Sequence, residues 1–297
     1  MLKEKVADTP ATKPHHAPAA GALDELICYF EGAWVPMRDA KVSVMTHAFM
    51  YGTATFEGIR AYWNEEEGTL YGLKLREHVE RLRHSCRILL MKDVPSVDEL
   101  TGLIVETIRR NGFREDAYIR PSFYKSTKAI GVRLHHLENE LYIITIPFGN
   151  YIDTEKGVRL MTSSWRRNAD EAVVLTSQGH VNESSAANIY VVRDGVAITP
   201  PVNDDLLEGV TRKALMELLG NEGIPVQERS INRSELYVAD EIFVCGTGVQ
   251  ISPVVEVDHR KVGSGAVGPI ARLVRDRYFE AVRGRLPEYR HWLTPIQ

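Results

Sequence analysis

A polar stretch without hydrophobic periodicity, Asn150–Gly157, divides this chain into two blocks, and each block mixes strand-like with helical segments. The blocks span 23–149 and 158–297, and the Pro-, Ala- and Lys-rich residues 1–22 are expected to be a disordered tail. This pattern predicts a mixed α+β/α/β fold, with a small N-terminal α/β domain, an interdomain linker and a larger C-terminal domain. Ligands usually bind in the cleft between two such domains.

Helical signals are clearest in the first block. Apolar residues recur at helical spacing along Arg76–Met91, which predicts an amphipathic helix. Ser96 and Glu99 predict a capping box at the start of a second helix, and Gly112 predicts its end. The strands expected in this block are two short ones about Glu31-Gly32, a hairpin around Asn64–Gly68, and then Ala117–Lys125 and Leu141–Pro147.

The second block is rich in strands before it becomes helical. The pattern predicts strands at Val158–Ser164, Ala172–Thr176, Asn188–Val192, Val196–Thr199, Pro225–Arg229 and Glu241–Cys245. Helices are expected at Val210–Leu219 and Ile270–Val282, and Gly246-Thr247-Gly248 is expected to form a tight turn that exposes its backbone.

The composition excludes several classes of function. A hydrophobic content of 44% and a charged content of 26% are ordinary for a globular protein, and a net charge of −4 argues against nucleic acid or an anionic membrane as the main partner. The three cysteines are far apart and lack CxxC spacing, so they predict neither disulfides nor a metal site and fit a reducing cytoplasm. No P-loop, GxGxxG or GxSxG motif is present.

Three stretches could together bind a phosphate. Arg60 enters a strand beside Gly58, Val210 and Thr211 begin a helix, and Thr247 lies in the glycine turn. An arginine fork, the free N–H groups of a helix start and the N–H groups of a turn all favour anions. Taken singly, each has an ordinary alternative as a surface charge, a helix cap or a turn that ends a strand.

Two further stretches could bind charged groups. Glu183 in VNESSAANIY is either a turn residue or the partner of a buried cation such as a protonated pyridine nitrogen, and Asn188 could orient it. Tyr118 and Arg120 in AYIRP share one face of a strand, which suits a carboxylate receptor as well as it suits an ion pair at the rim.

The ordered series of motifs resembles the branched-chain amino acid aminotransferases, which are fold-type IV enzymes that use pyridoxal 5′-phosphate (PLP). The resemblance runs from Ile27 to about Trp292. It is carried by AKVSVMTHAFMYGTATFEGIRAY, REHVERLRHSCRI, AYIRPSFYKS, VRLMTSSWRR, HVNESSAANIYVVRDGVAITPP, LLEGVTRKAL and ADEIFVCGTGVQISPV.

The resemblance assigns roles to residues. It implies that Arg60, Val210, Thr211 and Thr247 bind the cofactor phosphate. It further implies that Glu183, supported by Asn188, binds the pyridine nitrogen. For the substrate pocket it implies Phe30, Tyr118 and Arg120, with the arginine receiving the side-chain carboxylate of glutamate.

The resemblance also implies an activity and an assembly. The activity is transfer of the amino group of leucine, isoleucine or valine to 2-oxoglutarate by a cytoplasmic homodimer without a metal. A D-amino acid or amine transaminase is the nearest alternative, and a non-catalytic PLP-binding protein is another.

One departure from the family is serious. The family has its Schiff-base lysine and a cofactor-contacting tyrosine between the SSWRR strand and the Glu183 motif, yet neither residue type occurs between Trp165 and Glu183 here. The match resumes as if a strand end and a helix were missing between Asp170 and Glu171. None of the nearby lysines takes the place of that residue: Lys125, Lys128, Lys156 and Lys213.

Two hypotheses explain this gap. Either the sequence omits a segment that the protein has, or the deletion is real and the chain cannot form the covalent link of the family. Omission is the favoured hypothesis, because loss of a core helix should destabilise the domain around an otherwise intact site. An intact mass equal to the 33.5 kDa of this sequence would contradict it.

Overall fold

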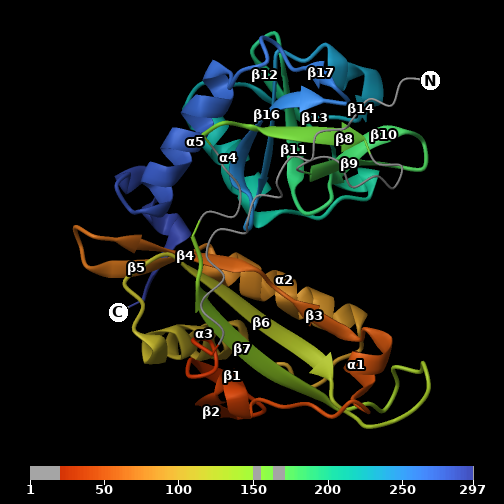
Figure 1. Ribbon diagram of the computed structural model, residues 1–297, viewed down its shortest axis with the longest axis vertical. Coiled ribbons are helices and arrows are strands. Elements are labelled where there is room, and N and C mark those ends of the chain that lie inside the picture. Colours follow the sequence, from red (N-terminus) through yellow and green to blue (C-terminus); the bar gives the residue numbers. More distant parts are fainter. Residues whose placement is uncertain (1–20, 150–154, 163–170, 297) are drawn as a thin grey trace, which may run out of the picture.

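The computed structural model describes residues 21–149, 155–162 and 171–296, and these form two units, each built on a β-sheet (Figure 1). The predicted tail and most of the predicted linker lie outside the described residues, so their boundaries remain predictions. No helix in the described ranges is long and apolar enough to cross a membrane.

The first sheet has eight strands in the order β18-β5-β4-β6-β7-β1-β2, with β3 paired to β6. Its strands are β1 (Ile27–Phe30), β2 (Ala33–Pro36), β3 (Ala54–Phe56), β4 (Ile59–Asn64), β5 (Thr69–Leu73), β6 (Ala117–Lys125), β7 (Asn139–Pro147) and β18 (Leu293–Ile296). Both predicted hairpins are confirmed, and Glu31 and Gly32 take the positive φ angles of 47° and 92° that a tight turn between β1 and β2 requires. The C-terminal strand β18 belongs to this sheet, so the chain returns to its first unit.

Two helices, α2 (Leu75–Ile88) and α3 (Val97–Asn111), cover one face of this sheet. The capping box is confirmed, because the Ser96 hydroxyl accepts from Glu99 N–H and the Glu99 carboxylate accepts from Ser96 N–H. The helix ends at Gly112 in the left-handed conformation, as predicted. The short helix α1 (His47–Tyr51) was not predicted.

The second sheet has ten strands in the order β13-β12-β11-β15-β16-β8-β9-β10-β14, with β17 paired to β16. They are β8 (Val158–Thr162), β9 (Glu171–Leu175), β10 (His180–Ser184), β11 (Asn188–Arg193), β12 (Val196–Thr199), β13 (Val226–Glu228), β14 (Ile231–Asn232), β15 (Glu241–Gly246), β16 (Gln250–Val257) and β17 (Arg260–Lys261). Alternate residues of β11 and β15 enter different cores, because Ile189 packs on one face of the sheet and Tyr190 on the other.

Two helices, α4 (Val210–Asn221) and α5 (Pro269–Val282), pack on one face of this second sheet (Figure 1). Glu241 on β15 fixes the start of α5, since its carboxylate accepts from the N–H groups of Ile270 and Ala271 at 3.0 and 2.8 Å. Four short 3-10 helices complete the fold: η1 (Met37–Asp39), η2 (Val202–Asp204), η3 (Arg233–Tyr237) and η4 (Pro287–Trp292).

The connection between β8 and β9 is unusually short. The two strands are parallel neighbours, with Leu160 opposite Glu171 and Thr162 opposite Val173, and only residues 163–170 join them. A crossover between parallel strands that contains a helix needs at least about 10–12 residues. This connection therefore lacks the length for the helix that the family resemblance places there.

Candidate active site

Glu183 and Asn188 lie together at the ends of β10 and β11, as the sequence predicted. The Asn188 amide donates to the Glu183 carboxylate at 3.0 Å and to the Leu207 carbonyl at 3.0 Å, and Leu207 N–H donates to the same carboxylate at 3.2 Å. Burial raises the pKa of Glu183, and the Leu207 N–H partly offsets this. No described cation neutralises this carboxylate, so a protonated pyridine nitrogen suits it.

The start of α4 is shaped to fit this pair. A Cβ atom at Gly209 would overlap the Oδ1 atom of Asn188, so only glycine lets the helix begin so close to β11. No side chain caps this helix, and Val210 and Thr211 are buried at its first turn. The first N–H groups of an uncapped helix form a ready anion site, which supports the predicted phosphate contacts.

Arg81 on α2 reaches this helix start, although the sequence analysis gave it no role. Its Nη1 atom donates to the Glu208 carbonyl at 2.8 Å, one residue before Gly209. Its Nε and Nη2 atoms both donate to Glu57 at 2.7 Å. The signal was within REHVERLRHSCRI, a stretch that was matched to the family without assignment of any single residue.

Arg60, the predicted phosphate ligand, makes a different set of contacts. Its guanidinium donates to the carbonyls of Phe148 (3.0 Å), Gly149 (2.9 Å), Thr247 (3.1 Å) and Gly248 (3.4 Å), and the residue is only 1% exposed. These carbonyls belong to the end of the first unit and to the glycine turn of the second. These contacts tie the two units together, and phosphate binding by Arg60 stays a prediction.

Thr247 lies beside these contacts. Its hydroxyl donates to the Gly58 carbonyl at 2.9 Å, which ties the glycine turn after β15 to the segment before β4. Phosphate binding by Thr247 therefore stays a prediction, and its hydroxyl proton is already used within the protein.

Tyr118 and Arg120 form the predicted pair on β6. Both nitrogens Nε and Nη2 of Arg120 donate to the Tyr118 hydroxyl, at 3.2 and 3.0 Å, and the guanidinium lies 4.5 Å from the ring centre of Phe56. A Cβ at Gly58 would lie 2.8 Å from the Tyr118 hydroxyl, so glycine makes room for this pair. Cation, hydroxyl and exposed aromatic ring thus form one wall.

Phe30, the third predicted pocket residue, lies on the same sheet, and its role in the pocket stays a prediction. It pairs with Tyr142 on β7, which in turn pairs with Ser122 on β6, so Phe30 lies two strands from β6 and one row away from Arg120. Phe56 directly precedes Glu57 and Gly58 and contacts Arg120. Phe56 also pairs with Ser122, so the two phenylalanines lie in one row of the sheet, and the sequence analysis did not name Phe56.

No described lysine serves as the expected Schiff-base residue. Lys213 is exposed and pairs with Glu208 at 2.8 Å, whereas Lys125 is buried and donates to the Leu90 carbonyl at 2.8 Å. Lys128 forms an isolated bridge with Thr46 near α1. The residues present therefore fit the ring nitrogen and phosphate of the cofactor, but they do not supply an amine to its aldehyde.

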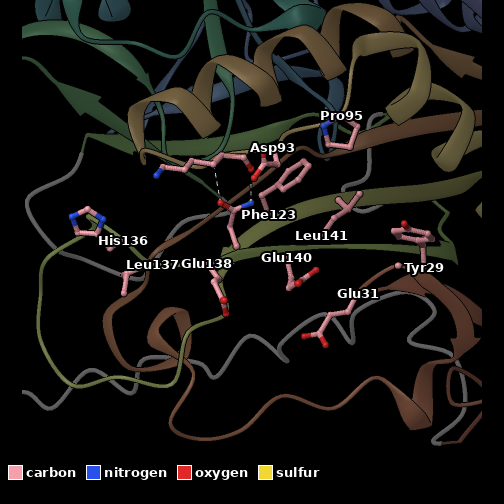
Figure 2. A pocket seen from close by; sticks show the side chains of 13 residues that line it. Tyr29, Glu31, Asp93, Pro95, Phe123, His136, Leu137, Glu138, Glu140 and Leu141 are labelled. Carbon is pink, nitrogen blue, oxygen red and sulfur yellow. Dashed lines mark hydrogen bonds between the residues drawn. The ribbon is translucent and has the colours of Figure 1, made fainter.

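A separate hollow of about 650 Å³ lies on the first unit (Figure 2). Phe123 lines it from the face of β6 opposite Arg120, and the carboxylates of Glu31, Glu138 and Glu140 gather at its edge. Burial and these neighbouring carboxylates raise the pKa of Glu140. Lys92 also lines the hollow, but the carboxylates outnumber this cation, so the hollow does not suit a phosphate.

The chain matches known proteins over nearly its whole length. The sequence model of the family "Amino-transferase class IV" matches residues 54–169 and 166–257. A probable branched-chain-amino-acid aminotransferase of Aquifex aeolicus is 45% identical over 90% of this chain and 96% of its own length. The branched-chain-amino-acid aminotransferase of Salmonella typhimurium is 33% identical over 90% of this chain and 96% of its own length.

Solved structures show the same fold. The branched-chain aminotransferase of Thermoproteus uzoniensis with norvaline has a TM-score of 0.86 at 39% identity, covering 92% of this chain and 99% of its own. The branched-chain amino acid aminotransferase of Thermobaculum terrenum, in its PLP-bound holo-form, has a TM-score of 0.86 at 31% identity, covering 93% of this chain and 99% of its own.

Fold and site together define an aminotransferase of class IV, a class whose cofactor is PLP. Within that class the chain belongs to the family of the branched-chain-amino-acid aminotransferases, given its identity to these relatives over nine-tenths of its length.

The comparisons also show where the chain is shorter than its relatives. The two matched parts of the class IV model meet at residues 166–169, within the short β8–β9 connection. The alignment with the Aquifex aeolicus protein runs over 298 positions, whereas 90% of this chain is about 267 residues. About 30 positions of that alignment therefore have no residue in this chain.

Proposed function

We propose that the site transfers the amino group of branched-chain L-amino acids to 2-oxoglutarate. The observation that carries the proposal is the segment Phe56–Arg60, three of whose residues contact different parts of the site. Phe56 contacts Arg120, Glu57 holds Arg81, and the Gly58 carbonyl accepts from Thr247. One short segment thus joins the substrate wall, the helix start of α4 and the glycine turn.

The residues around Glu183 fit the cofactor ring and phosphate. Bound PLP supplies an electron sink, and a carboxylate beside its ring nitrogen keeps that nitrogen protonated. Glu183 would do this, with Asn188 fixing its orientation. The N–H groups of Val210 and Thr211 would hold the phosphate together with Arg60 and Thr247, and the carbonyl contacts of Arg60 also tie the two units to each other.

The wall of Arg120, Tyr118 and Phe56 suits a pocket that must accept two kinds of side chain. The guanidinium receives the side-chain carboxylate of glutamate, and the aromatic ring beside it packs against an aliphatic side chain. We expect Arg120→Ala to reduce the kcat/KM for glutamate by at least about tenfold more than that for leucine, since a charge-assisted bond is lost with only one of them. Equal losses would contradict this role.

We further infer that a chain of these 297 residues holds PLP by non-covalent contacts alone. No lysine occurs between Lys156 and Lys213, and the β8–β9 connection lacks room for the missing helix. After PLP addition and borohydride reduction, the intact mass is expected to remain 33.5 kDa. A pyridoxyl adduct would contradict the inference, and a heavier protein would show that an additional segment is present.

The absence of that lysine also keeps a second function open. A PLP-binding protein without catalytic activity would keep reversible cofactor binding and show no turnover, even with an added primary amine. Transamination that appears on adding ethylamine would favour the aminotransferase, because a free amine can take over proton transfer that a lysine otherwise performs. Assays with D-leucine or with amines alone separate the other fold-type IV activities.

An apolar surface near α1 supports a homodimer. Val44 (71% exposed), Phe49 (69%), Ile130 (80%) and Val132 (79%) are open to solvent. The two segments are held together, since the His47 ring bonds to the Gly131 carbonyl at 2.7 Å. Large exposed apolar side chains on neighbouring segments are typical of an interface. Ile130→Glu is expected to shift the sedimentation of the protein from dimer to monomer.

The three free, buried cysteines fit a cytoplasmic location.

A further inference from the structure

Gln250 begins β16 in a backbone conformation that usually belongs to glycine. Its φ angle is 55°, in the left-handed region that disfavours any residue with a Cβ atom. It pairs with Gly246 across the hairpin and so closes the three-residue turn Thr247–Val249. Turns of this length commonly end in a left-handed residue, where glycine fits without strain. The strain indicates that the Gln250 side chain has a task that glycine could not perform.

The Gln250 side chain bonds across the junction between the two units. Gln250 is 1% exposed, and its Nε2 atom donates to the hydroxyl of Tyr62 on β4 at 3.4 Å. The Tyr62 hydroxyl also shares a hydrogen bond of 3.1 Å with the hydroxyl of Tyr278 on α5. Both tyrosines are fully buried. Because these groups are closed to solvent, no water competes for the bond between Gln250 and the first unit.

The turn is tied to β4 and to the residues just before that strand at three levels. The Thr247 hydroxyl donates to the Gly58 carbonyl at 2.9 Å, and Arg60 Nε donates to the Thr247 carbonyl at 3.1 Å. Arg60 and Tyr62 are alternate residues of β4, so their side chains lie on the same face of the strand. Gln250 bonds to Tyr62 and therefore supplies the third tie, at the end of the turn opposite Thr247.

We propose that Gln250 is a positioning residue, which bonds to Tyr62 and thereby holds the Thr247–Val249 turn in place for the cofactor phosphate. This inference rests on the proposed function, in which Thr247 contributes to phosphate binding. No described residue accepts from the N–H groups of Thr247 and Gly248, so both are free to donate to an anion. Gln250 acts through this turn. The alternative is that Gln250 only stabilises the junction between the units.

Binding of pyridoxamine 5′-phosphate and of pyridoxamine to the full chain separates these roles. Neither compound carries an aldehyde, so the Kd of pyridoxamine divided by that of its phosphate measures the phosphate contribution alone. Gln250→Gly is expected to lower that ratio by about three- to tenfold, the effect of losing one hydrogen bond. Its Tm should not fall, because glycine adopts the left-handed conformation without strain. A role in stability alone predicts the reverse, which is a lower Tm with an unchanged ratio.

Asp194→Gly is the matched control. Asp194 also has a positive φ angle, 50°, in the turn between β11 and β12, and no described residue bonds to its side chain. The same substitution there removes a left-handed side chain that has no partner across the junction. Its ratio is expected to stay at the wild-type value.

A double-mutant cycle tests whether Gln250 acts through its bond to Tyr62. In a Tyr62→Phe background, Gln250→Gly should lower the ratio no further, since the bond is already lost. An unchanged ratio in Gln250→Gly alone, or full additivity in the double variant, would overturn the proposal. A wild-type ratio near one would contradict the proposed phosphate site, and this inference with it. If Gln250→Gly does not fold, Tyr62→Phe removes the same bond and should lower the ratio by a similar factor, and an unchanged ratio there would also overturn the proposal.

Discussion

The two ends of the second sheet differ in how completely they are built. Around β11, β15 and α4 the pairing is regular, and Asn188, Gly209 and Glu183 fit one another at atomic contact. Around β8 and β9 the strands have five residues each, and only residues 163–170 join these parallel neighbours. The residues proposed for the ring and phosphate of PLP gather at the first end, and the lysine that the family resemblance implies belongs to the second.

This contrast shows that cofactor binding and covalent attachment rest on different parts of the fold. The proposed non-covalent contacts come from β10, β11 and the start of α4, and the described hydrogen bonds there join these elements to one another. A chain can therefore lose the crossover and keep the residues that bind the cofactor without a covalent bond. These residues, Glu183, Asn188 and the start of α4, are the binding half of the site. The following variants test whether covalent attachment and cofactor binding can be changed independently.

The largest effect is expected from restoring the crossover. About 30 residues of a class IV relative have no counterpart here. When they are inserted between Asp170 and Glu171, the cofactor should become trappable by borohydride. Turnover should rise by about 10²–10⁴-fold, the usual contribution of a positioned acid and base. The same insert with its lysine changed to alanine is the control. If both inserts behave alike, or if neither raises turnover, the missing lysine segment is not what separates cofactor binding from covalent attachment.

Glu183→Gln should have the next largest effect, measured in the lysine-containing variant. Turnover is expected to fall by about 10²–10³-fold, because the ring loses the charge that stabilises its electron-rich state. The Kd for pyridoxamine 5′-phosphate should change far less, since the phosphate contacts remain. Glu106→Gln, which removes an exposed carboxylate paired with Arg110, serves as the control. Near-normal turnover in Glu183→Gln would refute its role.

Gly209→Ala tests how tightly the binding half is fitted. The added methyl group would collide with Asn188, and such overpacking costs about 1–3 kcal/mol of stability. A loss of about tenfold in affinity for pyridoxamine 5′-phosphate should accompany it. Gly220→Ala, in the same helix with open space around it, should instead stabilise the protein by up to about 1 kcal/mol. Equal effects at both positions would show that the fit at Gly209 is unimportant.

The sequence predicted local features better than contacts between distant segments. The capping box of α3, its left-handed end and most strands follow from neighbouring residues, and all of these are confirmed. The roles of Arg60 and Arg81 depend on which residues lie across the junction between the two units. Spacing marked Arg60 because it sits in a strand beside a glycine, but only the fold shows that backbone carbonyls surround it.

The same limit applies to Phe56, which the sequence analysis did not name. Phe30 and Phe56 are both aromatic residues of the first sheet, and strand alternation alone cannot tell which one lies beside Arg120. Strand pairing decides it, because β3 lies along β6 whereas β1 is separated from β6 by β7. Glu183 and Asn188 were easier to find, since they are five residues apart and their contact is local.

The smallest effect is a change in the pH dependence of stability without cofactor. Burial raises the pKa of Glu183, so the folded state binds this proton more tightly than the unfolded state does. As the pH rises from about 4.5 through the raised pKa, the wild type should lose stability relative to Glu183→Gln, which cannot titrate there. Thermal unfolding at a series of pH values measures the difference. With pyridoxamine 5′-phosphate bound, the protonated ring nitrogen should neutralise the carboxylate and reverse the order. A difference that is the same at every pH would mean that Glu183 is not held in a desolvated position, and the binding half of the site would then lose its main electrostatic feature.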